Sequence, residues 1–326
     1  MTKEPKEDMA DVKPPWKMSV NNRDAFGQTL LELGRENTHI VALNADLSGS
    51  TKTSVFAKEF PKRHFNVGIA EQCMMGMAAG LATTGKISVP STFAVFATGR
   101  VYDFIRQSIA YPKLNVKIVA SHAGITVGGD GASHQIAEDL ALMRVLPNMR
   151  VVVPADAIET DRAFRAVVKE PGPFYFRIGR SATPVILPND YEFRLGKAYQ
   201  LRDGKDITII GCGVMAPQAL WAAEMLKKHG IDARVLNMST IKPIDAEAIH
   251  EAARETKAII TCEEHSVIGG MGSAVAEQLV QGKSVPMKII GIKDCFGQSG
   301  EAEDLMCSYG LTAKDIAKEA EGLLKK

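Results

Sequence analysis

The segment HFNVGIAEQCMMGMAAGLATTGKISVPSTF, residues 64–93, combines a strand pattern, a helix pattern and a second strand pattern. FNVGI and KISVPSTF are short apolar runs, and the helical stretch between them covers residues 71–84. Short apolar strands that alternate with helices are typical of a parallel sheet covered by helices on both faces. This unit therefore predicts an α/β fold.

The same alternation continues on both sides of this segment. HIVALNA, NVKIVAS and MRVVVPA have the strand pattern, and further helices are expected at 98–111, 135–145 and 157–169. Residues 181–204 are rich in Pro, Gly and charge, which indicates a linker with an edge hairpin. The alternation then resumes in DITIIG, DARVLNM, AIITCEE and MKIIGI. We therefore expect two successive α/β domains with mainly parallel sheets, over residues 18–187 and 188–326, after a flexible N-terminal arm of residues 1–17 that mixes both charges with prolines.

Composition narrows the class of protein. The chain has 326 residues, of which 45% are hydrophobic and 24% charged, and its net charge is +1. A net charge this close to zero produces no overall electrostatic field that would favour binding to nucleic acid or to an anionic membrane. The five cysteines are scattered, which is typical of reduced thiols, and we find neither a secretory signal nor an apolar run long enough to span a bilayer. These features predict a soluble cytoplasmic enzyme.

Glu71 is the first candidate for chemistry. It stands at the entrance to the helix at 71–84, where a carboxylate commonly stabilises the helix dipole and does nothing more. Its flanking residues are apolar or small, so we expect the carboxylate to be desolvated, with a raised pKa and the ability to share a proton. The spacing alone leaves both interpretations open.

The loop SHAGITVGGDGASHQ, residues 121–135, is the second candidate. It holds four glycines with His122, Asp130 and His134, and it follows a strand of the buried type. Open α/β sheets bind ligands at the carboxyl ends of their strands, and glycines let the backbone approach a ligand closely. The competing interpretation is a flexible surface loop with incidental histidines. The spacing does not fit a metal site.

The third group of candidate residues has basic or hydroxyl side chains, and the fourth group has aromatic side chains. Arginine and hydroxyl side chains suit phosphate, although exposed ion pairs are the more usual role for arginine. An aromatic ring at the end of a strand can stack on a heterocycle, but a single one is more often part of the core. The residues concerned are Arg23, Asp46, Ser50, Arg177 and Arg180 in the third group, and Phe93 and Phe96 in the fourth.

Taken in order, these segments resemble transketolases and deoxyxylulose-phosphate synthases. The resemblance rests on GIAEQ, STF, the H-A-G-I-x-x-G-x-D-G-x-x-H loop and IIGCGVMAPQAL, and it runs from about residue 19 onward. Those enzymes also carry an N-terminal domain with a Gly-Asp-Gly…Asn motif for Mg²⁺ and diphosphate, which this sequence lacks. The chain is therefore expected to resemble the pyrimidine-binding plus C-terminal domain subunit of a split transketolase.

The resemblance implies thiamine diphosphate as cofactor, with Mg²⁺ or Ca²⁺ held by the partner subunit. Glu71 would bond the cofactor's N1′ nitrogen, Phe96 together with Phe93 would stack on its aminopyrimidine, and His134 would lie near the 4′-amino group. Glu71, His122 and His134 would thus be catalytic. The implied substrate-binding residues are Arg23, Asp46, Ser50, His122, Asp130 and Arg180.

The implied activity is transfer of a two-carbon ketol unit from a ketose phosphate to an aldose phosphate through a thiamine-diphosphate carbanion or enamine, as in the pentose phosphate pathway. The chain would be active only with an N-terminal transketolase subunit, in an α₂β₂ assembly. His122 and the split architecture favour transketolase over the synthases, whereas Gln72 and Gly99 are closer to the synthases. Two further functions stay open: a 2-oxoacid dehydrogenase beta subunit, which rarely carries the D-G-x-x-H loop, and a non-catalytic assembly subunit.

Overall fold

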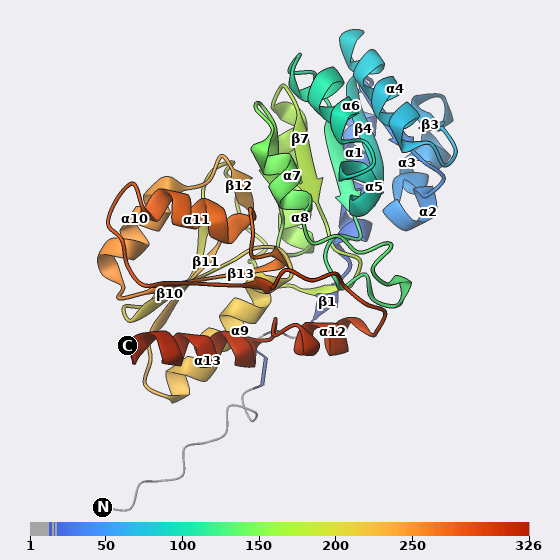
Figure 1. Ribbon diagram of the computed structural model, residues 1–326. Coiled ribbons are helices and arrows are strands. Elements are labelled where there is room, and N and C mark those ends of the chain that lie inside the picture. Colours follow the sequence, from blue (N-terminus) through green and yellow to red (C-terminus); the bar gives the residue numbers. More distant parts are fainter. Residues whose placement is uncertain (1–12, 15, 17, 326) are drawn as a thin grey trace, which may run out of the picture.

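The computed structural model describes residues 13, 14, 16 and 18–325, which form two α/β units (Figure 1). The arm expected at residues 1–17 lies largely outside the described residues. Within it, the Trp16 ring packs edge-on against Trp221, with 5.7 Å between ring centroids. The fold class expected from the alternating pattern, two α/β domains with mainly parallel sheets, is confirmed.

The first unit is built on a seven-stranded sheet with the order β12-β6-β7-β5-β4-β2-β3. Every neighbouring pair is parallel except β12 and β6, which are antiparallel. A separate pair of two-residue strands, β1 and β8, is also antiparallel. The strands are β1 Ser19–Val20, β2 Ile40–Asn44, β3 His64–Asn66, β4 Ile87–Phe93, β5 Lys117–Ser121, β6 Arg150–Val152, β7 Phe174–Arg177, β8 Thr183–Pro184 and β12 Thr240–Lys242.

Helices cover both faces of this sheet. On one face, Phe26 of α1, Phe56 of α3 and Phe164 of α8 share a core with Phe174 and Phe176 of β7. On the other face lie α4, α5, α7 and the π-helix η3. The helices are α1 Asn22–Glu36, α2 Ser48–Thr51, α3 Thr53–Glu59, α4 Glu71–Thr83, α5 Ala94–Thr98, α6 Tyr102–Phe104, α7 Asp139–Val145 and α8 Ala157–Lys169, with short turns η2 Pro61–Arg63, η3 Ile105–Ala110 and η4 Gly128–Asp130.

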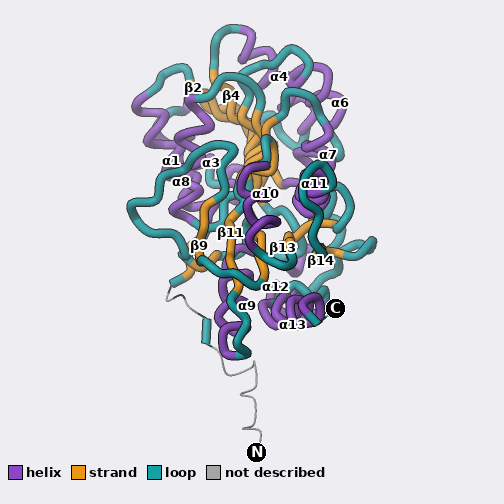
Figure 2. Tube along the Cα trace, turned by 90° about the vertical axis from the view of Figure 1, so that its left-hand side faces the viewer, coloured by secondary structure: helices purple, strands orange, loops and turns teal. Residues whose placement is uncertain are grey.

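The second unit has a five-stranded sheet with the order β14-β13-β10-β11-β9, parallel except for the edge strand β9. Helices α9 and α13 pack together on one side of the sheet, and α10 and α11 on the other. Figure 2 shows α10 and α11 toward the first unit and α9 and α13 at the far end. The elements are β9 Tyr199–Arg202, β10 Ile207–Gly211, α9 Met215–Lys228, β11 Ala233–Asn237, α10 Ala246–Glu255, β13 Ile259–Ser266, α11 Met271–Leu279, β14 Met287–Ile292, α12 Ala302–Ser308 and α13 Ala313–Leu324.

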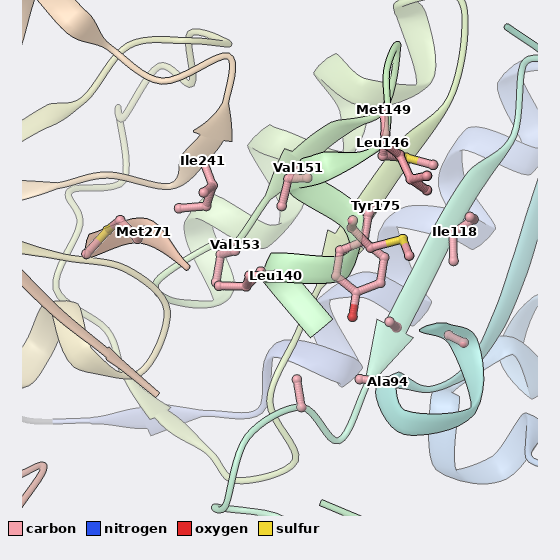
Figure 3. Close-up of a cluster of buried hydrophobic side chains, with 14 of the residues drawn as sticks. Ala94, Ile118, Leu140, Leu146, Met149, Val151, Val153, Tyr175, Ile241 and Met271 are labelled. Carbon is pink, nitrogen blue, oxygen red and sulfur yellow. The ribbon is translucent and has the colours of Figure 1, made fainter. Parts of the chain in front are cut away.

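One apolar core joins the two units. Met271 of α11, in the second unit, belongs to the same buried cluster as four residues of the first unit, namely Leu140, Val151, Val153 and Ile241 of β12 (Figure 3). These five side chains are at most 1% exposed. Because burial of apolar area stabilises at roughly 25 cal/mol per Å², a shared core of this kind fixes the two units against each other.

The structure corrects several local expectations. Residues 181–204 form no hairpin, since β8 pairs with β1 and β9 pairs with β11. The strand β12 lies within residues 188–326 yet extends the first sheet. The helix expected at 135–145 begins only at Asp139, because the preceding residues still belong to the glycine-rich loop that starts at residue 121, called the glycine loop below. Among the described residues, no helix has the length and apolarity that crossing a membrane requires.

Candidate functional site

The candidate residues gather at one edge of the first sheet. They follow the carboxyl ends of five parallel strands, where open α/β sheets place their ligands. In chain order these are Asp46 and Ser50 after β2, Glu71 after β3, Phe93 at the end of β4, His122 after β5 and Arg180 after β7. Arg23 joins them from the first turn of α1, whose N-cap is Asn21.

Glu71 is the first residue of α4 and only 3% exposed, so the burial expected from its apolar flanks is confirmed. Its carboxylate is not alone, however. The Arg100 Nη1 atom donates to Glu71 Oε2 at 2.9 Å. A buried carboxylate needs such a partner, because an unpaired charge in this environment is costly. Arg100 could not be identified from the sequence, because it lies 29 residues from Glu71 and belongs to no local pattern.

Arg100 also lies over an aromatic ring. Its guanidinium carbon is 4.4 Å from the centroid of Phe96, a cation–π distance. The side-chain amide of Gln72 donates to the Arg100 carbonyl oxygen at 3.3 Å, which ties the α5–α6 turn to α4. One planar cation therefore contacts both the buried carboxylate and the aromatic face.

Phe93 and Phe96 have different environments. Phe93 is 7% exposed and stacks on the His122 ring, with 3.7 Å between centroids and 22° between planes. Phe96 is half-buried and has its edge-on neighbour in His134, at 5.5 Å and 75°. Phe93 thus supports a histidine, whereas Phe96 offers a face to the site.

His122 is held on several sides. Its Nδ1 atom lies 2.9 Å from Ser121 Oγ and its Nε2 atom 3.5 Å from Arg23 Nη1, and its φ of 57° is left-handed. Burial, together with the positive charges of Arg23 and Arg180 and the nearby His134, lowers the pKa of His122 to about 3. The imidazole is therefore neutral at physiological pH.

A cationic cluster surrounds His122. Arg23 Nη1 donates to the Ser50 carbonyl oxygen at 3.0 Å, and Arg180 Nη1 donates to the Val127 carbonyl oxygen at 2.7 Å. The pKa of Arg23 is lowered, chiefly by burial and also by repulsion from Arg180, although Asp24 opposes the shift. Two arginines close enough to repel each other favour an anionic ligand.

Arg177 does not belong to this cluster. It is 5% exposed and donates to Asp139 from Nε at 2.7 Å and to the Glu264 carbonyl oxygen at 2.8 Å. The phosphate-binding interpretation of Arg177 is therefore wrong, because the buried pair with Asp139 occupies its guanidinium. Arg180, three residues later, is exposed.

Asp46 and Asp130 lie at the exposed rim of the candidate site. Asp46 is exposed, has a positive φ of 61° and accepts a hydrogen bond from Asn66 Nδ2 at 3.2 Å. Asn66 Oδ1 in turn accepts from the backbone N–H groups of Asp46 and Gly68, at 2.9 and 3.1 Å, so it links the β2 and β3 loops. Asp130 is exposed at the end of the η4 turn.

The second unit holds the glycine loop from behind. Glu264 of β13 accepts a hydrogen bond from the Thr126 backbone N–H at 2.5 Å, and burial raises the pKa of this carboxyl. At Gly124, whose φ is +77°, a Cβ atom would come within 2.1 Å of the Glu264 carboxyl carbon, so only glycine fits there. The Gln135 amide also donates to the carbonyl oxygen of Gln298 at 3.0 Å. The position of the loop thus depends on both units.

No cluster of three or more His, Cys, Asp or Glu side chains suited to a metal ion occurs within residues 13–14, 16 and 18–325.

Comparison with known proteins finds relatives of both units. Residues 18–185 match the model of the transketolase pyrimidine-binding domain, and residues 196–316 match that of the transketolase C-terminal domain. The chain is 52% identical over 307 residues to a putative transketolase C-terminal section from Methanocaldococcus jannaschii, covering 93% of this chain and 96% of that one. It is 43% identical over 305 residues to one subunit of an apulose-4-phosphate transketolase from Phocaeicola vulgatus, covering 93% and 97%.

A solved structure is similar over almost the same length. It is described as a split gene transketolase in an inactive beta4 tetramer, and it is 54% identical to this chain. The TM-score is 0.88, with 94% of this chain and 99% of that chain covered.

Proposed function

This chain belongs to the transketolase family, as a pyrimidine-binding plus C-terminal domain subunit of a split transketolase, and from that premise we propose how it works. We propose that, together with a separate diphosphate-binding chain, it transfers a two-carbon ketol unit from a ketose phosphate to an aldose phosphate. Thiamine diphosphate, which the family implies, would be the cofactor.

The contacts of Arg100 are the observation that supports this proposal most strongly. A planar group with in-plane N–H donors already contacts the buried Glu71 carboxylate and the face of Phe96. A protonated aminopyrimidine is also a planar N–H donor with an aromatic face to stack. The residues present therefore fit the pyrimidine half of thiamine diphosphate.

Three residues of this chain would each make a different contact with the cofactor. Glu71 would accept the N1′ hydrogen bond and Phe96 would stack on the ring, while His134, in edge contact with Phe96, would lie near the 4′-amino group. When bound, the cofactor supplies the carbon centre that cleaves the carbon–carbon bond and keeps the two-carbon unit. The protein supplies proton control at Glu71 and orientation.

The cationic cluster would bind the sugar phosphate. Arg23 and Arg180 both lie near His122, and Ser50, whose carbonyl oxygen Arg23 already contacts, brings a hydroxyl from the short helix α2. The neutral imidazole of His122 has one N–H that can donate to a sugar oxygen and one nitrogen that can accept from a sugar hydroxyl. Asp130 and Asp46, at the rim, would bind donor hydroxyls. Phe93 would act through His122, because its ring is buried against the imidazole.

A second chain would complete the site. We propose that this partner is an N-terminal transketolase subunit that binds the diphosphate with Mg²⁺ or Ca²⁺, and that the assembly is α₂β₂. Two findings support this: a 43% identical relative is described as one subunit of its enzyme, and a 54% identical chain alone is described as an inactive tetramer.

The test is a reconstituted transfer assay. The chain is mixed with a candidate N-terminal subunit, thiamine diphosphate and Mg²⁺, and a panel of ketose phosphates that includes apulose 4-phosphate is screened for release of the carbonyl fragment that remains after loss of the two-carbon unit. Turnover should appear only in the mixture. Glu71→Gln should lower kcat at least roughly tenfold, since a hydrogen bond to a charged group contributes about 1.5–3 kcal/mol. Glu59→Gln, which alters an exposed pair with Arg35, should leave turnover unchanged.

The same assay separates the competing functions. Release of CO₂ from pyruvate without a condensation product would favour the 2-oxoacid dehydrogenase subunit. Release of CO₂ coupled to condensation of the remaining two-carbon unit with an aldose phosphate would favour the synthases. Equal rates for Glu71→Gln and the unmodified chain in a reconstituted assay would indicate a non-catalytic assembly subunit.

A further inference from the structure

Arg100 and its partner Glu71 differ in their exposure to solvent. The Arg100 side chain is 47% exposed, whereas the Glu71 side chain that it pairs with is 3% exposed. The guanidinium reaches from the α5–α6 turn into the site, and its backbone is fixed to α4 through Gln72. The side chain can therefore rotate out to solvent while the turn keeps its place.

The two groups that Arg100 contacts are those that the proposed function assigns to the cofactor. The Glu71 carboxylate accepts one of its N–H donors at 2.9 Å, and the Phe96 ring lies 4.4 Å from its guanidinium carbon. A guanidinium is planar, carries its donors in the plane and stacks on aromatic rings. In these respects it has the shape and the hydrogen bonding of a protonated aminopyrimidine.

We infer that Arg100 is a stand-in for the aminopyrimidine, which occupies the Glu71–Phe96 position in the cofactor-free chain and must leave it when thiamine diphosphate binds. The inference rests on the proposed function. Its physical reason is the cost of leaving Glu71 unpaired, because buried charges are retained only when they are paired and hydrogen-bonded. Arg100 keeps the carboxylate paired before assembly and competes with the cofactor afterwards.

If Arg100 competes with the cofactor, removing it should strengthen cofactor binding and at the same time lower the stability of the cofactor-free chain. Arg100→Met removes the competitor, so the Kd of the assembled enzyme for thiamine diphosphate with Mg²⁺ should fall roughly threefold to tenfold, the range expected for a half-exposed ion pair with a cation–π contact. The same variant leaves Glu71 unpaired in the isolated chain, so its Tm without cofactor should fall. An arginine with a merely structural role would weaken both.

The experiment measures Kd by calorimetry on the chain mixed with its partner, and Tm on the chain alone. Arg35→Met is the matched control, because it removes an arginine from an exposed pair with Glu59 and should leave the Kd unchanged. Arg100→Lys, which keeps the charge but loses the planar stack, should give a Kd between those of the Met variant and the unmodified chain.

The outcomes separate this inference from the proposed function. If the unmodified mixture binds thiamine diphosphate and Glu71→Gln weakens binding, an equal or higher Kd for Arg100→Met overturns the stand-in role alone. If Arg100→Met is too unstable to assemble, the Kd of Arg100→Lys decides, and a value equal to or above that of the unmodified chain overturns it. Absence of binding to the unmodified mixture overturns both.

Discussion

Acidification should destabilise the folded chain through His122. Its imidazole stacks on Phe93, touches Arg23 and Ser121, and is close to Arg180 and His134. Burial and the neighbouring cations hold its pKa at about 3, whereas an unfolded histidine has a pKa of about 6.5. Between these values the unfolded chain binds a proton that the folded chain does not, so the free energy of unfolding must fall as the pH falls.

The size of the effect follows from the two pKa values. Each pH unit well inside this window costs about 1.4 kcal/mol. From pH 7.5 to 5.5, which crosses the unfolded pKa, the loss due to His122 integrates to about 1.4 kcal/mol. Below pH 5.5 the loss should grow by nearly that amount for every further unit until the folded pKa is reached.

The assay is urea unfolding of the full chain at fixed protein concentration, at pH 7.5 and 5.5. Other groups also titrate, so the informative quantity is the difference from His122→Gln, which removes the imidazole. The unmodified chain should lose about 1.4 kcal/mol more stability than this variant. His39→Gln, at an exposed histidine, should keep the full pH dependence. Identical pH dependence in the unmodified chain and His122→Gln would refute the account of His122 as a buried neutral group.

Three further results are expected. Asp139→Ala leaves the buried Arg177 guanidinium without its carboxylate partner and should cost about 3–5 kcal/mol in urea unfolding. Glu59→Ala, at an exposed pair, should cost far less, and a cost for Asp139→Ala no larger than that of Glu59→Ala would argue against the buried pair. Phe96→Ala should raise the calorimetric Kd of the assembled enzyme for thiamine diphosphate roughly fivefold or more through lost stacking, and an unchanged Kd would exclude Phe96 as the stacking residue. Glu264→Ala should speed hydrogen exchange in residues 122–135, because it removes a hydrogen bond that holds the loop, and unchanged exchange would mean that the second unit does not fix it.

Much of the fold follows from local pattern. The helix expected at 157–169 forms over Ala157–Lys169, because Asp156 caps it and its apolar residues share one face. The expected edge hairpin fails for a physical reason: β8 and β9 find partners that are distant in sequence, and nothing local specifies them. The short strand β12 is likewise defined by packing between the units.

The candidate site, like the fold, could be predicted from the sequence only in part. Strand ends are predictable, so the residues that follow β2, β3, β4 and β5 could be identified as neighbours from the sequence. Contacts that depend on side-chain reach could not. Arg100 meets Glu71 across 29 residues, and Glu264 reaches Thr126 across 138. Arg177 and Arg180 could not be told apart from the sequence. Their roles differ because Arg177 is buried beside Asp139.

If the cofactor site is shared between two chains, calorimetry will show that both chains are needed for binding. Thiamine diphosphate with Mg²⁺ is titrated into this chain alone, into the candidate N-terminal subunit alone and into their mixture, with Glu71→Gln as the paired variant. Tight binding is expected in the mixture only, and Glu71→Gln should weaken it roughly tenfold or more. Binding to this chain alone that is as tight as in the mixture, or binding in the mixture that is indifferent to Glu71→Gln, would contradict a shared site.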